Sequence, residues 1–569
     1  MFSLREPLGA ELRDVLKEYD DLSALLLAGR GITSSEDAEV FLSPSYDAHI
    51  HDPMLIKNMP VAAARLAKAI ETKEKIAVWS DYDCDGIPGG VLLHDFLKKA
   101  KANFVNYIPH RHDEGYGVNK MGLEKLRNDG VSLVVTVDSG IVDNEAVAYG
   151  NSLGLEIIVT DHHEPQDELP PALAVIDPKQ EGETYPFREL CGAGLAWKLA
   201  CATLQRGWKG REEIPPGWEK WLLDMAGLAT IADMVPLVGE NRVIARYGLL
   251  VMRKSPRLGF QKLCRVARVN QRSITEDDVG FMIAPRVNAA SRMGNPMDAF
   301  RLFTTEDEVE ADELAKLLEK INRSRRAMVG SVTRAVHERL SERETIPDVI
   351  VMGDPEWRPG LLGLVANSLA EEYSRPVFLW GKEGSGIIKG SCRAGRKSVN
   401  VVDLMSAAGD VLIQFGGHSQ SGGFSVRDDA VFFLEENLCA ALAAVEATAR
   451  HESVLADAEL APDHATHDLL RRLERFAPFG MGNPKPVFAL RNVEIESVSW
   501  FGKSGEHLKI RIVREFGTPL EGVCFYAKRE LGIGTEFVAT GTKAQVLGSL
   551  ELDQFSRGRP VRLRLVSIV

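Results

Sequence analysis

At 569 residues the chain is too long for one ordinary domain, and its size predicts about three or four hydrophobic cores. Its apolar content of 45% and charged content of 26% are average for globular proteins, which excludes wholesale disorder and a fibrous architecture. The net charge of −13 excludes a uniformly basic nucleic-acid binder, so any contact with a nucleic acid must use a local basic track.

The seven cysteines are scattered and include no C-x-x-C pair, so neither a disulfide framework nor a thiolate zinc site is expected. No apolar run approaches the roughly 18 residues that are needed to span a bilayer. The start MFSLREPLGAELRDVL lacks the apolar core of a secretory signal. We therefore expect a cytoplasmic protein without a membrane partner.

Three short apolar runs between residues 76 and 160 alternate with helical stretches, which predicts a parallel sheet with crossover helices. The runs are IAVWS, LVVTV and EIIVT, and each is followed by an acidic residue: Asp81, Asp138 and Asp161. The carboxyl ends of the strands line the ligand crevice of an open α/β sheet. These acids should therefore converge on one site.

The segment SDYDCDG carries carboxylates at every second position, Asp81, Asp83 and Asp85, just before Gly86. Three acids packed so closely require a counter-ion. A solvated acidic turn or a calcium loop is the alternative, but an EF-hand would need glutamate at its twelfth position, where Leu92 stands. The pattern favours a metal site.

Two further segments add imidazole and carboxylate groups. In TDHHE, the adjacent His162 and His163 cannot easily present both rings to one metal, so one should bind the ion and the other the substrate phosphate. Asp233 lies in the apolar stretch LATIADMVPL, where an unpaired carboxylate would be costly to bury. Carboxylate and imidazole ligands without sulfur favour two Mn²⁺ or Mg²⁺ ions, which suit phosphodiester hydrolysis.

The pattern changes along the rest of the chain, so the predicted fold class is multidomain α/β. We expect an N-terminal region over residues 1–45 and the parallel-sheet domain over 46–300. Charged residues with apolar ones at helical spacing predict a long connecting helix over 301–345. A second α/β domain should occupy 346–450, and short strands between glycine-rich turns predict a small barrel of the oligonucleotide-binding (OB) type over 451–569.

Aromatic residues are interleaved with basic ones in the expected barrel. They are Trp500, Phe501, Phe525 and Tyr526. Bases stack on such side chains in grooves that bind single strands, while basic residues neutralise the phosphates. For each aromatic residue, a place in an ordinary barrel core or surface is nearly as probable.

The ordered set DYDCDG, VDSG, DHHE and IADMVPL resembles the DHH phosphoesterase superfamily. Further along, APRVNAASRMG, WRPGLLGLVA, FGGHSQSGGFSV and PFGMGNPKPVF resemble the signatures of the RecJ-type single-stranded-DNA-specific exonucleases. The resemblance covers nearly the whole chain. It implies a DHH domain, then the associated DHHA1 domain, then the OB-like barrel.

The resemblance also implies a metal centre with two Mn²⁺ or Mg²⁺ ions. The implied ligands are Asp83, Asp85, Asp138, His162 and Asp233. Asp81 and His163 would complete the catalytic centre as a ligand or as a phosphate contact.

Two groups of substrate contacts follow from the same resemblance. Arg286, Asn288 and Arg292 would line the DNA path, and guanidinium groups suit it because they pair bidentately with phosphate. The terminal phosphate or sugar would be held by Ser391, Arg393 and His418. The alternative is that the two arginines on the DNA path are surface charges of a helix and that the histidine is a turn residue.

The chain departs from the family pattern at four positions. Ser80 stands where glycine is usual and Cys84 where a small alanine is common, and neither change removes a ligand. Arg358 stands where histidine is common and Cys392 where glycine is usual, and both changes bear on the recognition of the DNA end.

The implied activity is metal-dependent hydrolysis of single-stranded DNA, 5′ to 3′, in DNA repair and recombination. A helicase and a single-stranded-DNA-binding protein are the implied protein partners. One alternative is a DHH phosphodiesterase of short oligoribonucleotides or cyclic dinucleotides, against which the expected barrel argues. Another is a non-catalytic DHH scaffold in replication, against which the complete set of predicted ligands argues.

Overall fold

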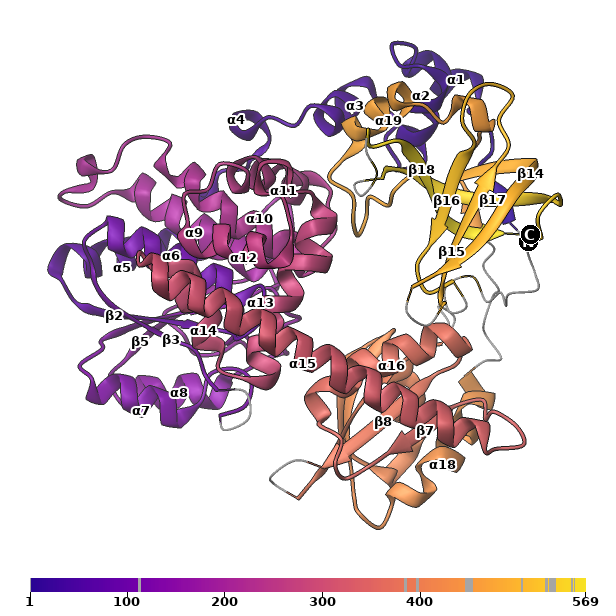
Figure 1. Ribbon diagram of the computed structural model, residues 1–569. Helices are drawn as coiled ribbons and strands as arrows, with labels where there is room; N and C mark the ends of the chain where they lie inside the picture. Colours follow the sequence, from indigo (N-terminus) through magenta and orange to yellow (C-terminus); the bar gives the residue numbers. More distant parts are fainter. Residues whose placement is uncertain are drawn as a thin grey trace. The chain divides into compact units, whose positions relative to one another are not determined.

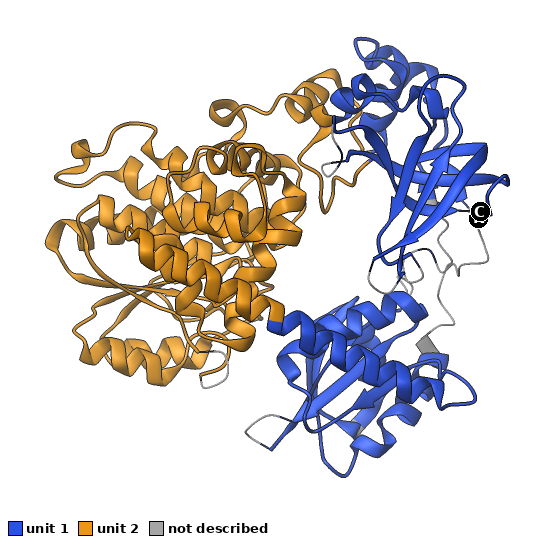
Figure 2. Ribbon diagram, viewed as in Figure 1, with its two compact units in different colours: residues 1–29, 324–473, 486–569 blue, residues 30–323, 474–485 orange. Residues whose placement is uncertain are grey.

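The computed structural model describes residues 2–568 except 111–113, 383–385, 396–398, 446–453, 503–504, 528–530, 532–538, 554–555 and 557. The chain divides into two compact units (Figure 2). Unit 1 consists of residues 1–29, 324–473 and 486–569, and unit 2 of residues 30–323 and 474–485. Each unit therefore combines segments that are far apart in the sequence.

The sheet of unit 2 has five parallel strands in the order β3-β2-β4-β5-β6. They are β2 (Lys75–Ser80), β3 (Asn103–Tyr107), β4 (Leu133–Val137), β5 (Glu156–Thr160) and β6 (Ala174–Ile176). Successive strand residues point to opposite faces. In β2, Ile76 and Val78 enter one core while Ala77 and Trp79 enter the other. Both faces are buried, and the predicted parallel sheet is confirmed.

Helices cover both faces of this sheet (Figure 1). On one face lie α5 (Met59–Thr72), α6 (Gly86–Lys99) and α9 (Gly192–Arg206), and on the other α7 (Lys120–Asn128) and α8 (Asn144–Ser152).

Between residues 223 and 304, unit 2 contains five further α-helices. They are α10 (Leu223–Ala232), α11 (Gly239–Met252), α12 (Leu258–Ala267), α13 (Ala284–Met293) and α14 (Pro296–Thr304). The backbones of α10 and α11 approach closely at Gly227 and Gly248, where a Cβ on Gly227 would lie 2.7 Å from the Cα of Gly248. A turn of π-helix, Asp278–Ile283, leads into α13.

The long connecting helix is α15, Glu308–Ser341. The first residues of the range predicted for it belong to α14, and α15 begins after Asp307, whose carboxylate accepts the backbone N–H of Glu310 at 2.8 Å. Residues up to 323 belong to unit 2 and later ones to unit 1. No helix within the described ranges is long and apolar enough to cross a membrane.

Unit 1 contains a five-stranded mixed sheet in the order β10-β11-β9-β8-β7. Its strands are β7 (Ile350–Gly353), β8 (Val377–Lys382), β9 (Ile388–Arg393), β10 (Leu412–His418) and β11 (Ser421–Val426). Within the described part of this sheet, β7 and β8 pair in parallel and the other neighbouring strands pair in antiparallel. The helices α16 (Pro359–Tyr373), α17 (Val401–Ala407) and α18 (Leu434–Val445) complete this second α/β part.

The C-terminal part of unit 1 is a barrel that closes through pairing of β14 with β17. Its strands are β13 (Ala458–Glu459), β14 (Phe488–Phe501), β15 (His507–Ile512), β16 (Leu520–Cys524), β17 (Lys543–Leu552) and β18 (Val561–Ile568). The long β14 takes part in both halves of the barrel because it pairs with β15 at one end and β17 at the other. The predicted multidomain α/β fold with a terminal barrel is confirmed.

The start of the chain belongs to unit 1. The strand β1 (Phe2–Leu4) pairs in parallel with β12 (Val454–Ala456), and Arg5 forms an ion pair with Asp457 at 2.9 Å. The region expected over residues 1–45 is thus divided, because residues from 30 onward belong to unit 2.

Candidate metal centre

The acidic loop after β2 leads directly into α6. Asp81 and Asp85 are buried, and Asp83 is half-buried. The loop folds back on itself because the backbone N–H groups of Asp85 and Gly86 donate to Asp83 Oδ1, at 2.8 and 3.2 Å. A Cβ at Gly86 would lie 2.5 Å from the carbonyl oxygen of Asp81, so only glycine fits this turn.

Asp138 follows β4, the strand beside β2. Its backbone is left-handed, with φ of 60°, a conformation that aspartate tolerates better than most residues. The turn is held by the Thr136 hydroxyl, which donates to the Ser139 carbonyl at 2.7 Å. One carboxylate oxygen of the buried Asp138 lies within 4.8 Å of carboxylate oxygens of Asp81 and Asp83.

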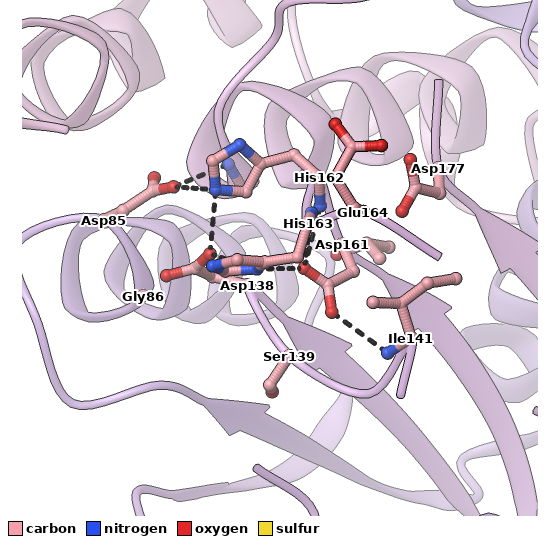
Figure 3. A network of polar contacts seen from close by, with 12 residues as sticks. Asp85, Gly86, Asp138, Ser139, Ile141, Asp161, His162, His163, Glu164 and Asp177 are labelled. Atoms are coloured by element: carbon pink, nitrogen blue, oxygen red, sulfur yellow. Dashed lines mark hydrogen bonds and ion pairs between the residues drawn. The ribbon is translucent and has the colours of Figure 1, made fainter. Parts of the chain in front are cut away.

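Asp161, at the end of β5, organises the two histidines that follow it (Figure 3). Its Oδ1 accepts the backbone N–H groups of His162 and His163, at 2.8 and 3.2 Å, and Nδ1–H of His163 at 2.7 Å. Its Oδ2 accepts the backbone N–H of Ile141 at 3.0 Å, which ties the loop after β4 to the loop after β5. The proton of the His163 ring is therefore on Nδ1 in the neutral form.

The ring of His162 is the point at which the carboxylates converge (Figure 3). Its Nε2 lies 3.2 Å from Asp138 Oδ1, 3.5 Å from Asp85 Oδ2 and 3.7 Å from Asp233 Oδ2. Asp233 arrives from another direction, as the residue that ends α10. Ligand atoms lie within 4.8 Å of one another in three triads: Asp138, His162 and His163; Asp85, His162 and Asp233; and Asp81, Asp83 and Asp138.

Burial makes this arrangement unfavourable without a cation. Burial, reinforced by Asp83, raises the pKa of Asp85 to about 7, and burial reinforced by Asp85 raises the pKa of Asp233 to about 9. Burial also lowers the pKa of His162 to about 3, so its imidazole is neutral, as metal ligands are. A divalent cation would offset the repulsion between the carboxylates. The donor set of oxygen and nitrogen atoms fits Mn²⁺ or Mg²⁺.

His163 differs from His162 in charge and exposure. Burial lowers its pKa, but the hydrogen bond to Asp161 and the negative charges of Asp161, Asp85 and Asp233 together outweigh burial and raise the pKa to about 9. The His163 side chain is 44% exposed, against 13% for His162. Tyr116 lies beside it, with its hydroxyl 3.5 Å from His163 Nδ1. A partly exposed imidazolium next to the acids is suited to an anionic substrate.

Three family models match successive parts of the chain: the DHH family N-terminal domain over residues 75–230, the DHHA1 domain over 347–451 and the RecJ OB domain over 456–567. The single-stranded-DNA-specific exonuclease RecJ of Bacillus subtilis is 36% identical over 550 residues, which cover 96% of this chain and 67% of that protein. RecJ of Thermus thermophilus is 33% identical, over 88% of this chain and 70% of that protein. The chain belongs to the RecJ family.

A solved RecJ structure has the same fold. The crystal structure of RecJ from Thermus thermophilus in complex with Mn²⁺ matches with a TM-score of 0.82 at 27% identity, covering 100% of this chain and 79% of that one. The same protein in complex with Mg²⁺ matches with a TM-score of 0.77, also at 27% identity, over 100% of this chain and 78% of that one.

The three residues that the RecJ resemblance assigns to the DNA path lie on α13, in unit 2. Asn288 Oδ1 accepts the backbone N–H of Cys84 at 2.8 Å and so holds the acidic loop. Arg286 is buried, and its guanidinium pairs with Glu319 of α15 at 2.7 Å. Arg292 is half-buried. The described contacts of the first two residues are with the protein itself, and their contact with DNA stays a prediction.

The residues that resemblance assigns to the DNA end lie on neighbouring strands of unit 1. Arg393 of β9 and His418 of β10 both pair in register with Ser421 of β11, one on each side. Ser391 is two residues before Arg393 and so lies on the same face of β9. A Cβ on Gly363 of α16 would lie 3.2 Å from the Arg393 guanidinium and 3.6 Å from Ser391 Oγ. The strand pairing brings these three residues together.

The structure gives physical reasons for three of the four departures from the RecJ pattern. Ser80 is buried. A Cβ on Gly90 of α6 would lie 2.1 Å from the Ser80 hydroxyl oxygen, so glycine at position 90 leaves room for the serine side chain. Cys84 is buried under α13. Cys392 is in the core, with Sγ 3.9 Å from Met405 Sδ, on the opposite face of β9 from its two neighbours. Arg358 is exposed, and nothing in the structure explains it.

Sequence reasoning missed part of the support around the acids. Asp161 is one of the strand-end acids that the sequence predicts to converge, but it has no role among the predicted site residues, although it accepts four hydrogen bonds. Its position after a parallel strand was the signal that could have included it. The backbone amides of Gly192 and Ala193, which donate to Asp85, had no such signal.

Proposed function

We propose that the chain is a metal-dependent exonuclease that hydrolyses phosphodiester bonds of single-stranded DNA, with two Mn²⁺ or Mg²⁺ ions as cofactors. The observation that carries the proposal is the convergence of three carboxylates, two buried and one half-buried, on the neutral His162 ring. Membership of the RecJ family supports the substrate, and the Mn²⁺ and Mg²⁺ complexes of RecJ from Thermus thermophilus support the ions.

Each predicted residue has a role in this proposal. The ions would be held by Asp83, Asp85, Asp138, His162 and Asp233, with Asp81 as a further ligand. When bound, they supply Lewis-acid stabilisation of the attacking and leaving oxygens of the phosphodiester. The protonated His163 donates a hydrogen bond from Nε2 to the scissile phosphate, while Asp161 holds its Nδ1. Arg286, Asn288, Arg292, Ser391, Arg393 and His418 remain proposed substrate contacts.

A cluster of aromatic rings on the barrel offers a platform for bases. His507, at the start of β15, has its ring centroid 5.1 Å from Phe501, 5.4 Å from Phe525 and 4.8 Å from Tyr526. The guanidinium of Arg564 lies 4.5 Å from the ring centroid of Phe525. Rings and a cation at one place suit base stacking with phosphate neutralisation. The match to the RecJ OB domain supports this role.

The proposal is tested by incubating the purified protein with end-labelled single-stranded DNA, duplex DNA and short RNA, with Mn²⁺ or with EDTA. We expect degradation of single-stranded DNA only with the metal, and Asp138→Asn should reduce the rate by more than about 100-fold, beyond the effect typical of residues outside the ligand set. Cleavage in EDTA would contradict the proposal. Degradation of dinucleotides but not of DNA would favour the oligoribonuclease alternative.

A separate prediction concerns the aromatic cluster. Tyr526→Ala should raise the KM for long single-stranded DNA by about 5- to 150-fold, because one stacked base contributes about 1–3 kcal/mol. The rate at saturating DNA should stay unchanged. Phe516→Ala is the matched control, since Phe516 is also an exposed aromatic residue of the barrel part, 75% exposed, but lies outside the cluster. Equal effects of the two variants on KM would reject the platform.

Family membership alone supports the finer parts of the proposal. They are 5′ to 3′ polarity, action in the cytoplasm in DNA repair and recombination, and cooperation with a helicase and a single-stranded-DNA-binding protein. Polarity is decided by the order in which label is released from substrates marked at the 5′ or the 3′ end. Co-purification with the cell's own helicases tests the partners.

A further inference from the structure

The first turn of α9 binds the carboxylate of Asp85, one of the proposed metal ligands. The backbone N–H of Gly192 donates to Asp85 Oδ2 at 2.6 Å, and that of Ala193 donates to Asp85 Oδ1 at 2.8 Å. Both carboxylate oxygens are therefore fixed by the same turn, and the positive end of the helix dipole faces the carboxylate. Asp85 Oδ2 lies 3.5 Å from His162 Nε2. The turn thus orients a carboxylate that must also face the ions.

The same turn packs against a second proposed ligand. A Cβ at Gly192 would lie 2.5 Å from Asp138 Cβ and 2.9 Å from Asp138 Cα. Real Cβ atoms do not come so close to backbone atoms, so a larger residue would displace Asp138 or the start of α9. Gly192 is helical rather than left-handed, and close approach is therefore the reason for glycine here.

Cys191, the residue before α9, connects this turn to a third proposed ligand. Its Sγ accepts the backbone N–H of Gly194 at 3.4 Å and lies 3.5 Å from Thr230 Oγ1. The Thr230 hydroxyl donates its only proton to the Ala226 carbonyl at 2.7 Å, which leaves its oxygen able to accept from the thiol in the contact between the two side chains. Thr230 is on α10, three residues before Asp233. The buried thiol therefore links α9, whose first turn binds Asp85, to α10, which is directly followed by Asp233.

We propose that Cys191, Gly192 and Ala193 are positioning residues that set the distances between Asp85, Asp138 and Asp233, and thereby the affinity for the metal ions. This inference rests on the proposed metal-dependent function. Carboxylate ligands must be held within about 0.5 Å of their productive geometry, and residues that support ligands typically change metal affinity by about 10- to 100-fold. The turn provides that support for three ligands from two helices and one strand end.

The test compares Mn²⁺ binding, measured by titration calorimetry, in Gly192→Ala and Gly194→Ala. Both variants add one methyl group to the first turn of α9, but at 194 the nearest atom to the new Cβ is 3.7 Å away. We expect Gly192→Ala to weaken Mn²⁺ binding by about 10- to 100-fold and Gly194→Ala to leave it near that of the unsubstituted protein. The Mn²⁺ concentration for half-maximal cleavage should rise by the same factor.

A second pair of variants keeps the test decisive if Gly192→Ala does not fold. Cys191→Ala should weaken Mn²⁺ binding, whereas Cys191→Ser should restore most of it, because a hydroxyl can accept from Gly194 and donate to Thr230. Cys264→Ala, at a buried cysteine of α12, is the control for loss of a buried thiol. Equal Mn²⁺ affinity of Cys191→Ala and the unsubstituted protein would overturn the inference, as would equal losses in Gly192→Ala and Gly194→Ala.

The outcomes also separate this inference from the proposed function. Mn²⁺ binding that follows the expected order without any cleavage of single-stranded DNA would reject the exonuclease and keep the positioning role. If single-stranded DNA is cleaved but substitutions at residues 191 and 192 leave the Mn²⁺ affinity unchanged, the positioning role is rejected and the exonuclease is kept. Absence of Mn²⁺ binding in the unsubstituted protein would reject both.

Discussion

Both carboxylate oxygens of Asp161 accept hydrogen bonds from the protein itself. One oxygen accepts two backbone amides and the His163 ring, and the other accepts the amide of Ile141. The carboxylate is buried, which raises its pKa, but the hydrogen bonds from His163 and Ile141 and the positive charge of His163 together outweigh burial and keep the pKa below the ordinary value. Its contribution is therefore to fix the two histidines and the loop after β4 in one arrangement.

Asp161→Asn should reduce cleavage of single-stranded DNA by about 10- to 100-fold, as is typical when a residue that orients a ligand is changed. An amide has one acceptor oxygen, so it cannot accept from both the His163 ring and Ile141 without losing another bond. Saturating Mn²⁺ should not restore the rate, because the proposed phosphate contact of His163 depends on the orientation of its ring. The measurement is the rate against Mn²⁺ concentration, with Asp177→Asn, a buried acid after β6, as the control.

The convergence of Asp81, Asp138 and Asp161 could be predicted because each one follows a parallel strand, and the ends of parallel strands meet. Asp233 was included because an unpaired carboxylate in an apolar stretch must have a partner. Arg286 shows the limit of such reasoning, since its ion pair with Glu319 on another helix leaves no pattern in the sequence. The hydrogen bonds from Gly192 and Ala193 to Asp85 were not predicted for a similar reason, because they come from backbone amides and leave no pattern in the residue types.

At the scale of elements, residues 474–485 are held on unit 2 by Arg242 of α11. The buried guanidinium donates to the carbonyls of Phe41 and Ala477 at 2.7 and 3.0 Å, and to those of Arg475, Phe476 and Pro478 at 2.9 to 3.4 Å. Asn483, which is also buried, donates to two of the same carbonyls at 2.8 Å. The motif that resembled RecJ in the sequence, PFGMGNPKPVF, thus carries the residues that attach this segment.

Arg242→Met should lower the free energy of unfolding of unit 2 by at least about 3 kcal/mol, because several buried carbonyls lose a charged donor. It should also expose residues 474–485 to proteases under native conditions. Urea denaturation and limited proteolysis measure the two effects. The matched control is Arg246→Met on the same helix, whose guanidinium donates to the single carbonyl of Leu42 in the described structure. Equal losses of stability in the two variants would contradict this account.

Element boundaries were predicted less well than element types. The helix expected over 301–345 is α15 together with part of α14, because charged residues continue across the break between them and only the capping by Asp307 marks the start. The N-terminal region was expected to be one piece. Its division between the units depends on the pairing of β1 with β12, and such a distant partner cannot be read from local pattern.

At the scale of the whole molecule, the acids should make the metal-free protein sensitive to alkaline pH. The folded pKa values of Asp85 and Asp233, about 7 and about 9, are above the ordinary value of 3.8. A group with a raised folded pKa contributes stability that is fully present below its unfolded pKa and is lost as the pH rises through the folded pKa. In EDTA, the unfolding temperature should therefore fall as the pH rises from about 4 to about 9.

Mn²⁺ should abolish most of this fall, because ion binding favours the deprotonated carboxylates. The difference in unfolding temperature between the Mn²⁺-loaded and the chelated protein should accordingly grow with pH. Asp233→Asn removes one of the titrating groups and should flatten the curve measured in EDTA. A parallel pH dependence with and without Mn²⁺ would show that the acids of the metal centre do not determine it.

The pairing of β1 with β12 also has a consequence for the time at which the protein can finish folding. Phe2 pairs with Val454, so the ribosome adds about 450 residues, roughly 20 to 90 s of synthesis, between the two partners. Unit 2 cannot complete its folding earlier either, since the carbonyls that accept hydrogen bonds from the guanidinium of Arg242 are in residues 475–478. During translation both units stay incomplete until the last fifth of the chain emerges. The nascent chain thus exposes an unpaired strand and an uncovered arginine for most of its synthesis, when chaperones can bind them.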